Sequence, residues 1–377
     1  MRFVRSERRH RDSVAGSVLS SRQFIKISHA LILTGGKMSN AVDSVWYGRN
    51  PLKYFLLPFS LIFLAAVSVR RLLYRTGLLK VRKSSVPVVV IGNISVGGSG
   101  KTPLVVHLAE KLREKGVRAG VVSRGYRADP GPEPLLIDGS TPPSSCGDEP
   151  YLIYHRLNVP VAVFPERPLA VAALEGKVDL ILSDDGMQHY AMGRAAEIAV
   201  IDASRGFGNG FVLPAGPLRE PASRLRNVSA AVINGDGFSG TLPDGLPVFH
   251  MRVEPSGFRR VKDGAKADLR AGKVTALAAI GNPGRFYRTL SEMGFEPVRT
   301  ISLPDHTPLT AKLIGELGID PALPLVMTEK DAVKCREFAG DSWYYLQIDA
   351  VLDGDLAGFI MKAAGIKAPQ GGAEENK

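Results

Sequence analysis

The segment VVVIGNISVGGSGKTPLVVHLAEKL, residues 88–112, has the composition of a phosphate-binding loop between a strand and a helix. Its glycines let the backbone turn sharply and direct several N–H groups inward, and the start of a helix adds positive potential there. Lys101 can then reach the β- and γ-phosphates of a nucleotide, and the Thr102 hydroxyl can bind Mg²⁺. The residues expected to contact the nucleotide are Ser95, Val96, Gly97, Gly98, Ser99, Gly100, Lys101 and Thr102. Ser95 replaces the first glycine of the usual G-x-x-x-x-G-K-S/T pattern, so the loop is a variant.

A second polar cluster follows another apolar run, in VDLILSDDGMQHY at residues 178–190. Asp184 and Asp185 stand just beyond the predicted strand, and adjacent carboxylates repel one another unless a cation lies beside them. A P-loop site needs a metal-side carboxylate at the end of a neighbouring strand. Such a pair alone is more often a turn that caps a helix, but downstream of a P-loop it predicts a Mg²⁺ site. The chain is therefore expected to bind ATP and Mg²⁺.

The loop does not identify the phosphate acceptor. Its variant form is similar to the deviant loop of partitioning-type ATPases, K-G-G-x-G-K-T, which has an extra lysine where this chain has Val96. A membrane-associated regulatory ATPase of that type is therefore the alternative to a kinase. A non-catalytic membrane-binding module is a third class, and the intact Lys101 and Thr102 argue against it.

Apolar β-branched runs alternate with helical patterns from residue 86 onward, which predicts an α/β fold with a parallel sheet and helices on both faces. The predicted strands are 86–91, 117–122, 178–183, 198–202 and 230–234, with helical patterns at 102–115 and 149–157. We expect a P-loop kinase domain at 84–240, a connector with a β-ribbon at 241–272 and a smaller α/β domain at 273–366. Residues 367–377 are expected to be a disordered tail.

The net charge of +11 is distributed very unevenly. Residues 1–83 hold sixteen Lys and Arg and three Asp and Glu, a net charge of +13, so the remaining 294 residues carry about −2. This pattern favours an anionic membrane surface, whereas a nucleic-acid groove would need basic residues across the folded body. No nucleic acid and no obligate protein partner are predicted. Two cysteines form no disulfide framework, which fits a reducing compartment.

The N-terminal region divides into a basic extension and an apolar run. Residues 1–37 are expected to be a basic, disordered extension, and Met38 is an alternative start. Residues 38–83 are expected to be membrane-associated, because 54–69 carries no charge and would form a helix of about 24 Å against a hydrocarbon core of about 30 Å. The helix is therefore either a tilted span or a half-inserted anchor. A buried core helix is the other reading, and Arg70, Arg71, Arg75 and the break expected at Pro58 argue against it.

Nine short motifs occur in an order that resembles the tetraacyldisaccharide 4'-kinase family, the lipid A 4'-kinases of Gram-negative bacteria. The motifs are WYGRNPL, GNISVGGSGKTP, VSRGYRA, GDEPYLI, DDGMQHY, LPAGPLREP, IGNPGRF, LPDHTPL and TEKDAVK. Each is modest alone, but the ordered set is highly specific and covers most of the chain, from about residue 46 to about residue 349.

The resemblance implies a kinase on the cytoplasmic face of the inner membrane. It would transfer the γ-phosphate of ATP to the 4'-hydroxyl of a tetra-acylated glucosamine disaccharide 1-phosphate, which gives lipid IVA. It also implies two α/β/α domains joined by a β-ribbon, with ATP in the cleft and the N-terminal helix reaching a substrate held in the bilayer. The partners are thus a lipid A disaccharide precursor and the inner membrane surface.

The resemblance also implies roles for individual residues. Asp148 matches the proposed catalytic aspartate, and His306 matches the histidine proposed to pair with it across the cleft. Asp184 and Asp185 match the paired aspartates, with Asp185 the closer metal ligand. Arg219 and Glu220 match nucleotide-site residues, where Arg219 would neutralise the transferring phosphoryl group and Glu220 would complete the Mg²⁺ shell. The catalytic residues are therefore predicted as Asp148, His306 and Arg219, and the metal ligands as Thr102, Asp184, Asp185 and Glu220.

Other interpretations of these residues stay open. Asp-Glu-Pro before a helical run predicts that Asp148 caps the helix, a role compatible with catalysis because a helix start keeps a carboxylate ionised. Arg219 and Glu220 also fit an exposed ion pair. Thr307 stands where the family commonly has a second histidine, so His306 is taken as the important one. Residues whose roles are left open are Ser123, Arg124, Tyr126, Gln188, His189, Lys330 and Lys334.

Overall fold

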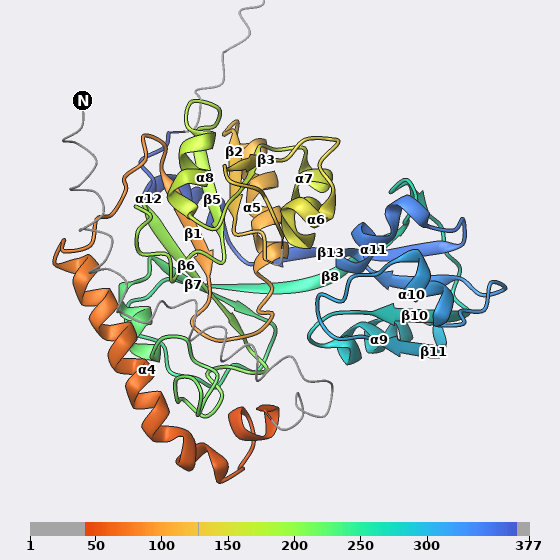
Figure 1. Ribbon diagram of the computed structural model, residues 1–377, viewed down its shortest axis with the longest axis horizontal. Helices are drawn as coiled ribbons and strands as arrows, with labels where there is room; N and C mark the ends of the chain where they lie inside the picture. The colour runs from red at the N-terminus through yellow and green to blue at the C-terminus, as the bar shows by residue number, and fades with distance from the viewer. Residues whose placement is uncertain (1–41, 127, 368–377) are drawn as a thin grey trace, which may run out of the picture.

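The computed structural model describes residues 42–126 and 128–367 of the chain. The predicted extension at residues 1–37 lies outside this part, as do residues 368–377 of the predicted tail. Figure 1 shows a larger lobe, residues 42–247 and 353–367, and a smaller lobe, residues 261–342. Two long strands, β8 (Val248–Arg260) and β13 (Trp343–Leu352), run between the lobes and join them.

The larger lobe contains a parallel sheet with helices on both faces, which confirms the predicted fold class. Its elements are α4 (Leu52–Arg75), β1 (Val88–Gly92), α5 (Lys101–Glu114), β2 (Ala119–Ser123), β3 (Leu135–Leu136), α6 (Pro143–Cys146), α7 (Asp148–Leu157), β4 (Val161–Val163), α8 (Arg167–Leu174), β5 (Leu180–Asp184), β6 (Ala196–Asp202), η1 (Ala222–Asn227), β7 (Ala230–Asn234) and α12 (Leu356–Ala363). The strand order is β7-β6-β1-β5-β2-β4-β3, and all pairs except β3–β4 are parallel.

Strand β1 shows why this sheet needs helices on both faces. Its five residues are all buried, and alternate side chains point to opposite faces of a strand. Val89 and Ile91 pack into a core with α5, α7 and α12, whereas Val88 and Val90 pack into a second core with α8. Because β1 pairs with both β5 and β6, the loop after β1 emerges at the centre of the carboxyl edge of the sheet.

The smaller lobe continues the sheet and has apolar cores on both of its faces. Its elements are β9 (Lys266–Ala267), β10 (Lys273–Ala278), α9 (Pro283–Glu292), β11 (Glu296–Ser302), α10 (Ala311–Glu316), β12 (Leu325–Thr328), α11 (Glu329–Cys335) and η2 (Arg336–Phe338). The order runs β11-β10-β12-β13-β8-β7, so the thirteen strands of the described residues form one sheet, with β9 paired to β8.

The β-ribbon is built from segments far apart in the sequence. β8 pairs antiparallel with β13 and, at its start, parallel with β7. After β13 the chain returns to the larger lobe, where α12 packs in the same core as α5. The predicted division at residues 273 and 366 stays a prediction, but the second ribbon strand and α12 both lie within the segment assigned to the smaller domain.

Helix α4 lies along the flank of the larger lobe (Figure 1). It has 24 residues, about 36 Å at the usual rise, and Pro58 lies inside it without ending it, so the break expected there was wrong. By length and composition this helix could cross a membrane, and only 6% of its most apolar window is buried. Its long outer face carries exposed side chains: Tyr54, Phe55, Phe59, Leu61, Ile62, Val69 and Leu72.

One buried serine attaches α4 to the lobe. The Ser60 hydroxyl donates to Val212 O at 2.8 Å and accepts from Ala215 N at 2.9 Å. Trp46 secures the same loop, because its indole N–H donates to Pro214 O at 3.0 Å. These bonds satisfy loop backbone groups that would otherwise be buried without partners.

We expect Ser60→Ala to lower the free energy of unfolding by about 1–3 kcal/mol, because the variant leaves the Val212 carbonyl and the Ala215 amide without their partner. Urea unfolding in detergent measures the change. Ser68→Ala, an exposed position on the same helix, is the matched control and should be neutral. Equal stabilities for the two variants would contradict the attachment.

Candidate active site

The loop between β1 and α5 is held in place by a buried asparagine. Asn234, at the end of β7, donates from Nδ2 to Ser99 O at 3.1 Å. Gly100 has φ 88°, and a Cβ there would lie 2.5 Å from Asn234 Nδ2, so only glycine fits. Val96 N donates to Pro217 O at 2.8 Å, which ties the loop to the segment before Arg219.

Lys101, at the start of α5, faces the acidic pair predicted from the sequence. Its Nζ lies 3.5 Å from Asp185 Oδ1, and Arg219 Nη1 lies 3.1 Å from both Asp185 oxygens. Burial raises the pKa of Asp185, but the charges of Arg219 and Lys101 outweigh it and hold the pKa far below its usual value. Asp185 has φ 49°, an uncommon conformation for a residue with a side chain and one that clusters at functional sites.

Asp184 is buried at the end of β5, and its Oδ1 has no hydrogen-bond partner. Burial, together with the negative charges of Glu149 and Asp185, raises the pKa of Asp184 to about 7, and Lys101 opposes this only in part. An unpaired buried carboxylate oxygen beside a second carboxylate fits a divalent cation with oxygen ligands. Among the described residues, no group of three or more His, Cys, Asp or Glu side chains forms a metal site.

Glu220 is buried and already engaged by protein donors. Gln188 Nε2 donates to Glu220 Oε1 at 3.0 Å, the Tyr190 hydroxyl donates to Oε2, and Arg224 Nε lies 3.3 Å from Oε2. Burial and the nearby Glu220 raise the pKa of Tyr190 to about 12, so its hydroxyl keeps its proton. Glu220 as a metal ligand stays a prediction, and it would have to exchange one of these donors for the metal. The alternative of an exposed ion pair was wrong for Glu220.

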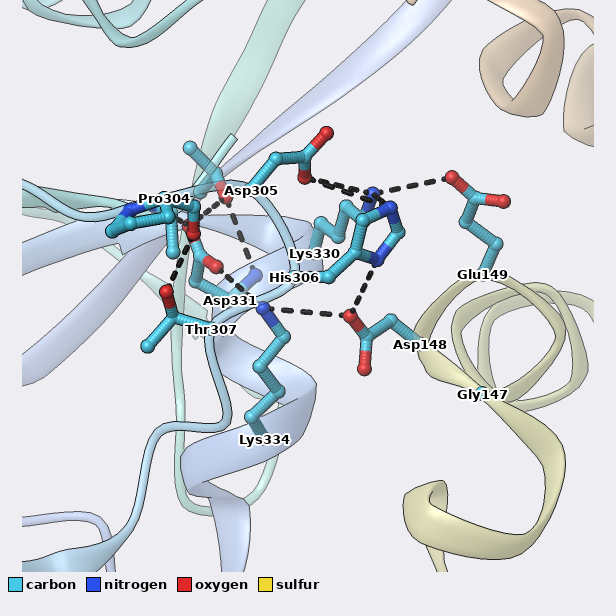
Figure 2. Close-up of polar contacts among 12 residues, drawn as sticks. Gly147, Asp148, Glu149, Pro304, Asp305, His306, Thr307, Lys330, Asp331 and Lys334 are labelled. Atoms are coloured by element: carbon cyan, nitrogen blue, oxygen red, sulfur yellow. Dashed lines mark hydrogen bonds and ion pairs between the residues drawn. The ribbon is translucent and has the colours of Figure 1, made fainter. Parts of the chain in front are cut away.

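Asp148 begins α7 but does not cap it. The N-cap is Gly147, at φ 91° and ψ 157°, and no side chain accepts a capping bond there. The capping role predicted for Asp148 was therefore wrong, because the helix starts one residue earlier than that role requires. The carboxylate instead faces the smaller lobe (Figure 2).

Across the gap between the lobes, Asp148 meets a histidine and a lysine (Figure 2). His306 Nδ1 and Lys334 Nζ lie 3.5 Å and 3.4 Å from Asp148 Oδ2. Lys334 is held by the fully buried Asp331 at 3.0 Å. Burial raises the pKa of Asp148, but the His306 hydrogen bond and the charges of Lys334 and Lys330 outweigh it, so the pKa lies below its ordinary value.

Lys330 favours one tautomer of His306. Its Nζ lies 3.3 Å from His306 Nε2, and because a lysine ammonium can only donate, this contact requires Nε2 to accept and leaves the proton on Nδ1, which faces Asp148; Asp305 Oδ1 also lies 3.7 Å from Nε2. Lys330 also contacts Glu149 at 3.2 Å and Asp305 at 3.4 Å. His306 has φ 61°, and the Tyr126 ring lies 4.9 Å from its ring. The left-open residues Lys330, Lys334 and Tyr126 therefore all belong to this cluster.

The remaining residues considered from the sequence lie close to the acidic pair. Gln188 bridges Glu220 and Arg219. Burial and nearby arginines lower the pKa of His189 to about 3, so it is neutral. Arg167 was missed: it is buried, donates to Val122 O at 2.9 Å and lies close enough to Asp184 for their charges to interact. No sequence signal marks it, whereas Asn234 could have been found by its place at the end of a predicted strand.

A hollow of about 230 Å³ lies at the ends of β7 and β13. Residues that line it include Asp236, His250, Met251 and Asp353. Met251 also contacts the phosphate loop, because its Cε would lie 3.0 Å from a Cβ on Gly100.

A P-loop whose lysine faces an acidic pair at the end of a neighbouring strand is typical of P-loop NTPases and kinases. The chain belongs to the tetraacyldisaccharide-1-P 4'-kinase family, LpxK, which it matches over residues 52–364. This confirms the resemblance predicted from the motifs.

Solved structures agree with this assignment. LpxK from Aquifex aeolicus, crystallised in complex with ATP, is 29% identical, superposes with a TM-score of 0.72, and the match covers 83% of this chain and 99% of that one. The signal recognition particle receptor FtsY from Elizabethkingia anophelis (14% identity, 52% of this chain and 66% of that one) and chloroplast FtsY from Physcomitrella patens (17%, 61% and 82%) each match with a TM-score of 0.28, which is too low to inform function.

We expect Asp184→Asn to stabilise the nucleotide-free protein at pH 8 by on the order of 3 kcal/mol. A carboxyl whose pKa is raised on folding favours the folded state only while protonated, so the stability of the unsubstituted protein falls as pH rises between 3.8 and about 7. The Asn variant lacks this fall. Urea unfolding with EDTA at pH 5 and pH 8 measures it, with Asp341→Asn, an exposed position, as the control. Parallel pH dependences would contradict the assignment.

Proposed function

We propose that this protein transfers the γ-phosphate of ATP to the 4'-hydroxyl of a tetra-acylated glucosamine disaccharide 1-phosphate in lipid A biosynthesis. Family membership supports the reaction, and the ATP complex of Aquifex LpxK supports the donor. The observation that carries the proposal is the contact of Asp148 with His306 between the two lobes, where the lowered pKa of Asp148 keeps its carboxylate ionised.

The nucleotide is held by the loop after β1. Lys101 and the backbone N–H groups of the loop bind its phosphates, and Arg219 lies where it neutralises the transferring group. Thr102, Asp184 and Asp185 would hold Mg²⁺, which spreads the negative charge of the phosphates. The hollow at the ends of β7 and β13 is the proposed position of the nucleotide base.

The acceptor hydroxyl is activated by Asp148 of the larger lobe, which His306 and Lys334 of the smaller lobe hold in place. Asp148 accepts its proton as the bond to phosphorus forms, and the Nδ1–H of His306 orients the carboxylate. Lys334 keeps Asp148 ionised and therefore able to accept a proton.

Helix α4 supplies the contact with the membrane. The family is membrane-associated, and we place this chain on the cytoplasmic face of the inner membrane, where the acceptor lies. Ser60 and Tyr74 both contact the folded lobe, and they are about 21 Å apart along the helix. A helix attached along that length favours a half-inserted anchor over a span, because a span would pull the lobe into the bilayer.

Labelled ATP, Mg²⁺ and the tetra-acyl disaccharide 1-phosphate test the proposal with the full chain in detergent. Label in the lipid is the expected result. Hydrolysis of ATP without labelled lipid would contradict it and indicate the regulatory ATPase of the partitioning type.

In this assay Asp148→Asn should lower kcat by on the order of 10²–10⁴ while ATP binding stays close to that of the unsubstituted protein, because the variant removes only the proton acceptor. Lys101→Ala should impair both, since Lys101 contacts the phosphates. Glu149→Gln, on the same turn of α7 and paired with Lys330, is the matched control. Equal losses for Asp148→Asn and Glu149→Gln would refute the assignment of the base.

Lys334→Met should shift the acidic limb of the kcat–pH profile to higher pH. The Lys334 charge helps to lower the pKa of Asp148, so its loss lets the carboxylate bind a proton at higher pH, and rate is lost sooner on acidification. A kcat profile from pH 3 to 8 measures the shift, because the pKa of Asp148 lies below its ordinary value of 3.8 in the unsubstituted protein. Lys312→Met, at an exposed position, should leave the limb unchanged, and so would Lys334→Met if Asp148 were not the base.

A further inference from the structure

The last turn of α4 touches the motif that carries the acidic pair. The Tyr74 ring lies 6.0 Å from the Tyr190 ring, at an interplanar angle of 34°. The Arg70 guanidinium lies over the Tyr74 ring at 5.9 Å. Tyr190 comes five residues after Asp185 in DDGMQHY, so the membrane-facing helix and the phosphate site meet at one side chain.

The hydroxyl of Tyr190 is fixed between a carboxylate and a guanidinium. It donates to Glu220 and accepts from Arg224 Nε at 3.3 Å. Arg224 is itself held by both oxygens of Glu197, at 2.5 and 2.8 Å, and all three charged side chains are buried. A buried polar group in such a network has little freedom, so a shift of the Tyr190 ring must move Glu220 or break its hydrogen bond.

From Glu220 the contacts continue to the lysine of the P-loop. Gln188 donates from Nε2 to Glu220 at 3.0 Å, and its Oε1 accepts from Arg219 Nη1 at 3.3 Å. Arg219 pairs with Asp185 at 3.1 Å, and Asp185 pairs with Lys101 at 3.5 Å. The links from Tyr190 to Lys101 are direct polar contacts, and the link from Tyr74 to Tyr190 is a contact between rings, so the path from helix to loop is physically continuous.

Helix α4 is attached to the lobe along one side only. Ser60 is its one fully buried residue, and Leu56, Phe63 and Leu64 pack on the lobe while still partly exposed. The helix therefore has fewer buried contacts than the elements of the sheet and shifts at a lower cost in free energy. Its exposed apolar face can be buried at a lipid surface. The helix therefore has two states, bound to lipid and free of lipid, and the phosphate site can bind its ligand with a different affinity in each.

We propose that Tyr190 is a positioning residue that couples α4 to the phosphate loop, so that binding of α4 to a lipid surface tightens the binding of ATP. The inference rests on the proposed function only for the identity of the nucleotide. Because coupling between two binding sites is reciprocal, ATP must strengthen binding to lipid by the same factor.

The test is a titration of the full chain with a fluorescent ATP analogue, with and without vesicles that contain phosphatidylglycerol. Vesicles should lower the Kd of the unsubstituted protein at least about fivefold, and the analogue should raise its affinity for vesicles in a co-sedimentation assay by the same factor. Neither readout requires turnover.

Two variants break the path at different points. Tyr190→Phe keeps the ring against Tyr74 but loses the hydroxyl bond to Glu220, so it should bind the analogue more weakly and show no vesicle effect. Tyr74→Ala leaves the bonds of Glu220 intact, so without vesicles it should bind the analogue as the unsubstituted protein does. It should still sediment with vesicles and should lose the vesicle effect.

Matched controls carry the same substitutions elsewhere. Tyr54→Ala removes an exposed tyrosine from the same helix, and Tyr287→Phe removes a hydroxyl that bonds to Ile301 O in the smaller lobe. Both should keep the vesicle effect.

The inference is overturned if vesicles leave the Kd of the unsubstituted protein unchanged, or if Tyr74→Ala and Tyr190→Phe keep the full effect. Phosphate transfer to the disaccharide by the same preparation separates this outcome from failure of the proposed function. Phosphate transfer with no effect of vesicles on the Kd would contradict only the coupling. An effect of vesicles on the Kd with no phosphate transfer would contradict only the kinase assignment.

Discussion

The contact of Asp148 with His306 and Lys334 is the interaction on which the rest of the structure depends. It joins the first turn of α7 on the larger lobe to the smaller lobe, and in the proposed mechanism it holds the base that accepts the proton of the acceptor hydroxyl. The long strands β8 and β13 make this contact possible, because they extend one sheet through both lobes and so fix the position of one lobe relative to the other. The fold thus serves to hold two halves of a site that lie 158 residues apart in the sequence.

The site is assembled from features that would be unfavourable elsewhere. Asp184 is buried with an unpaired oxygen, and Asp185 and His306 adopt left-handed backbone conformations. Such features persist only when the surrounding structure over-determines them, and here apolar cores on both faces of the sheet support the residues in each lobe. Charge is balanced locally, since Lys101 and Arg219 face Asp185 while Lys334 faces Asp148. Electrostatic preorganisation of this type is the main means by which proteins accelerate phosphoryl transfer.

The sequence predicted much of this because the relevant signals are local. The apolar run at residues 230–234 predicted a strand, and β7 has the same bounds. The α/β class and the kinase family are also confirmed. Contacts across the gap between the lobes leave no local signal. The spacing of Lys330 and Lys334 would be the same on a solvent-exposed helix as on a helix that faces a carboxylate, so it does not reveal their contacts. The pairing of Asp148 with His306 was predicted only from the family resemblance. Capping by Asp148 was wrong because Gly147 can adopt the N-cap conformation, and local pattern does not distinguish the two.

In the proposed mechanism the acceptor hydroxyl attacks ATP directly, and Asp148 takes a proton and never a phosphate. The stereochemistry at phosphorus tests this most directly. With ATP made chiral at the γ-phosphate by oxygen isotopes, one in-line transfer to the disaccharide must invert the configuration at phosphorus. We predict inversion in the 4'-phosphorylated product. Retention would show two successive transfers through a phosphorylated residue of the protein and would contradict the role of Asp148 as the base.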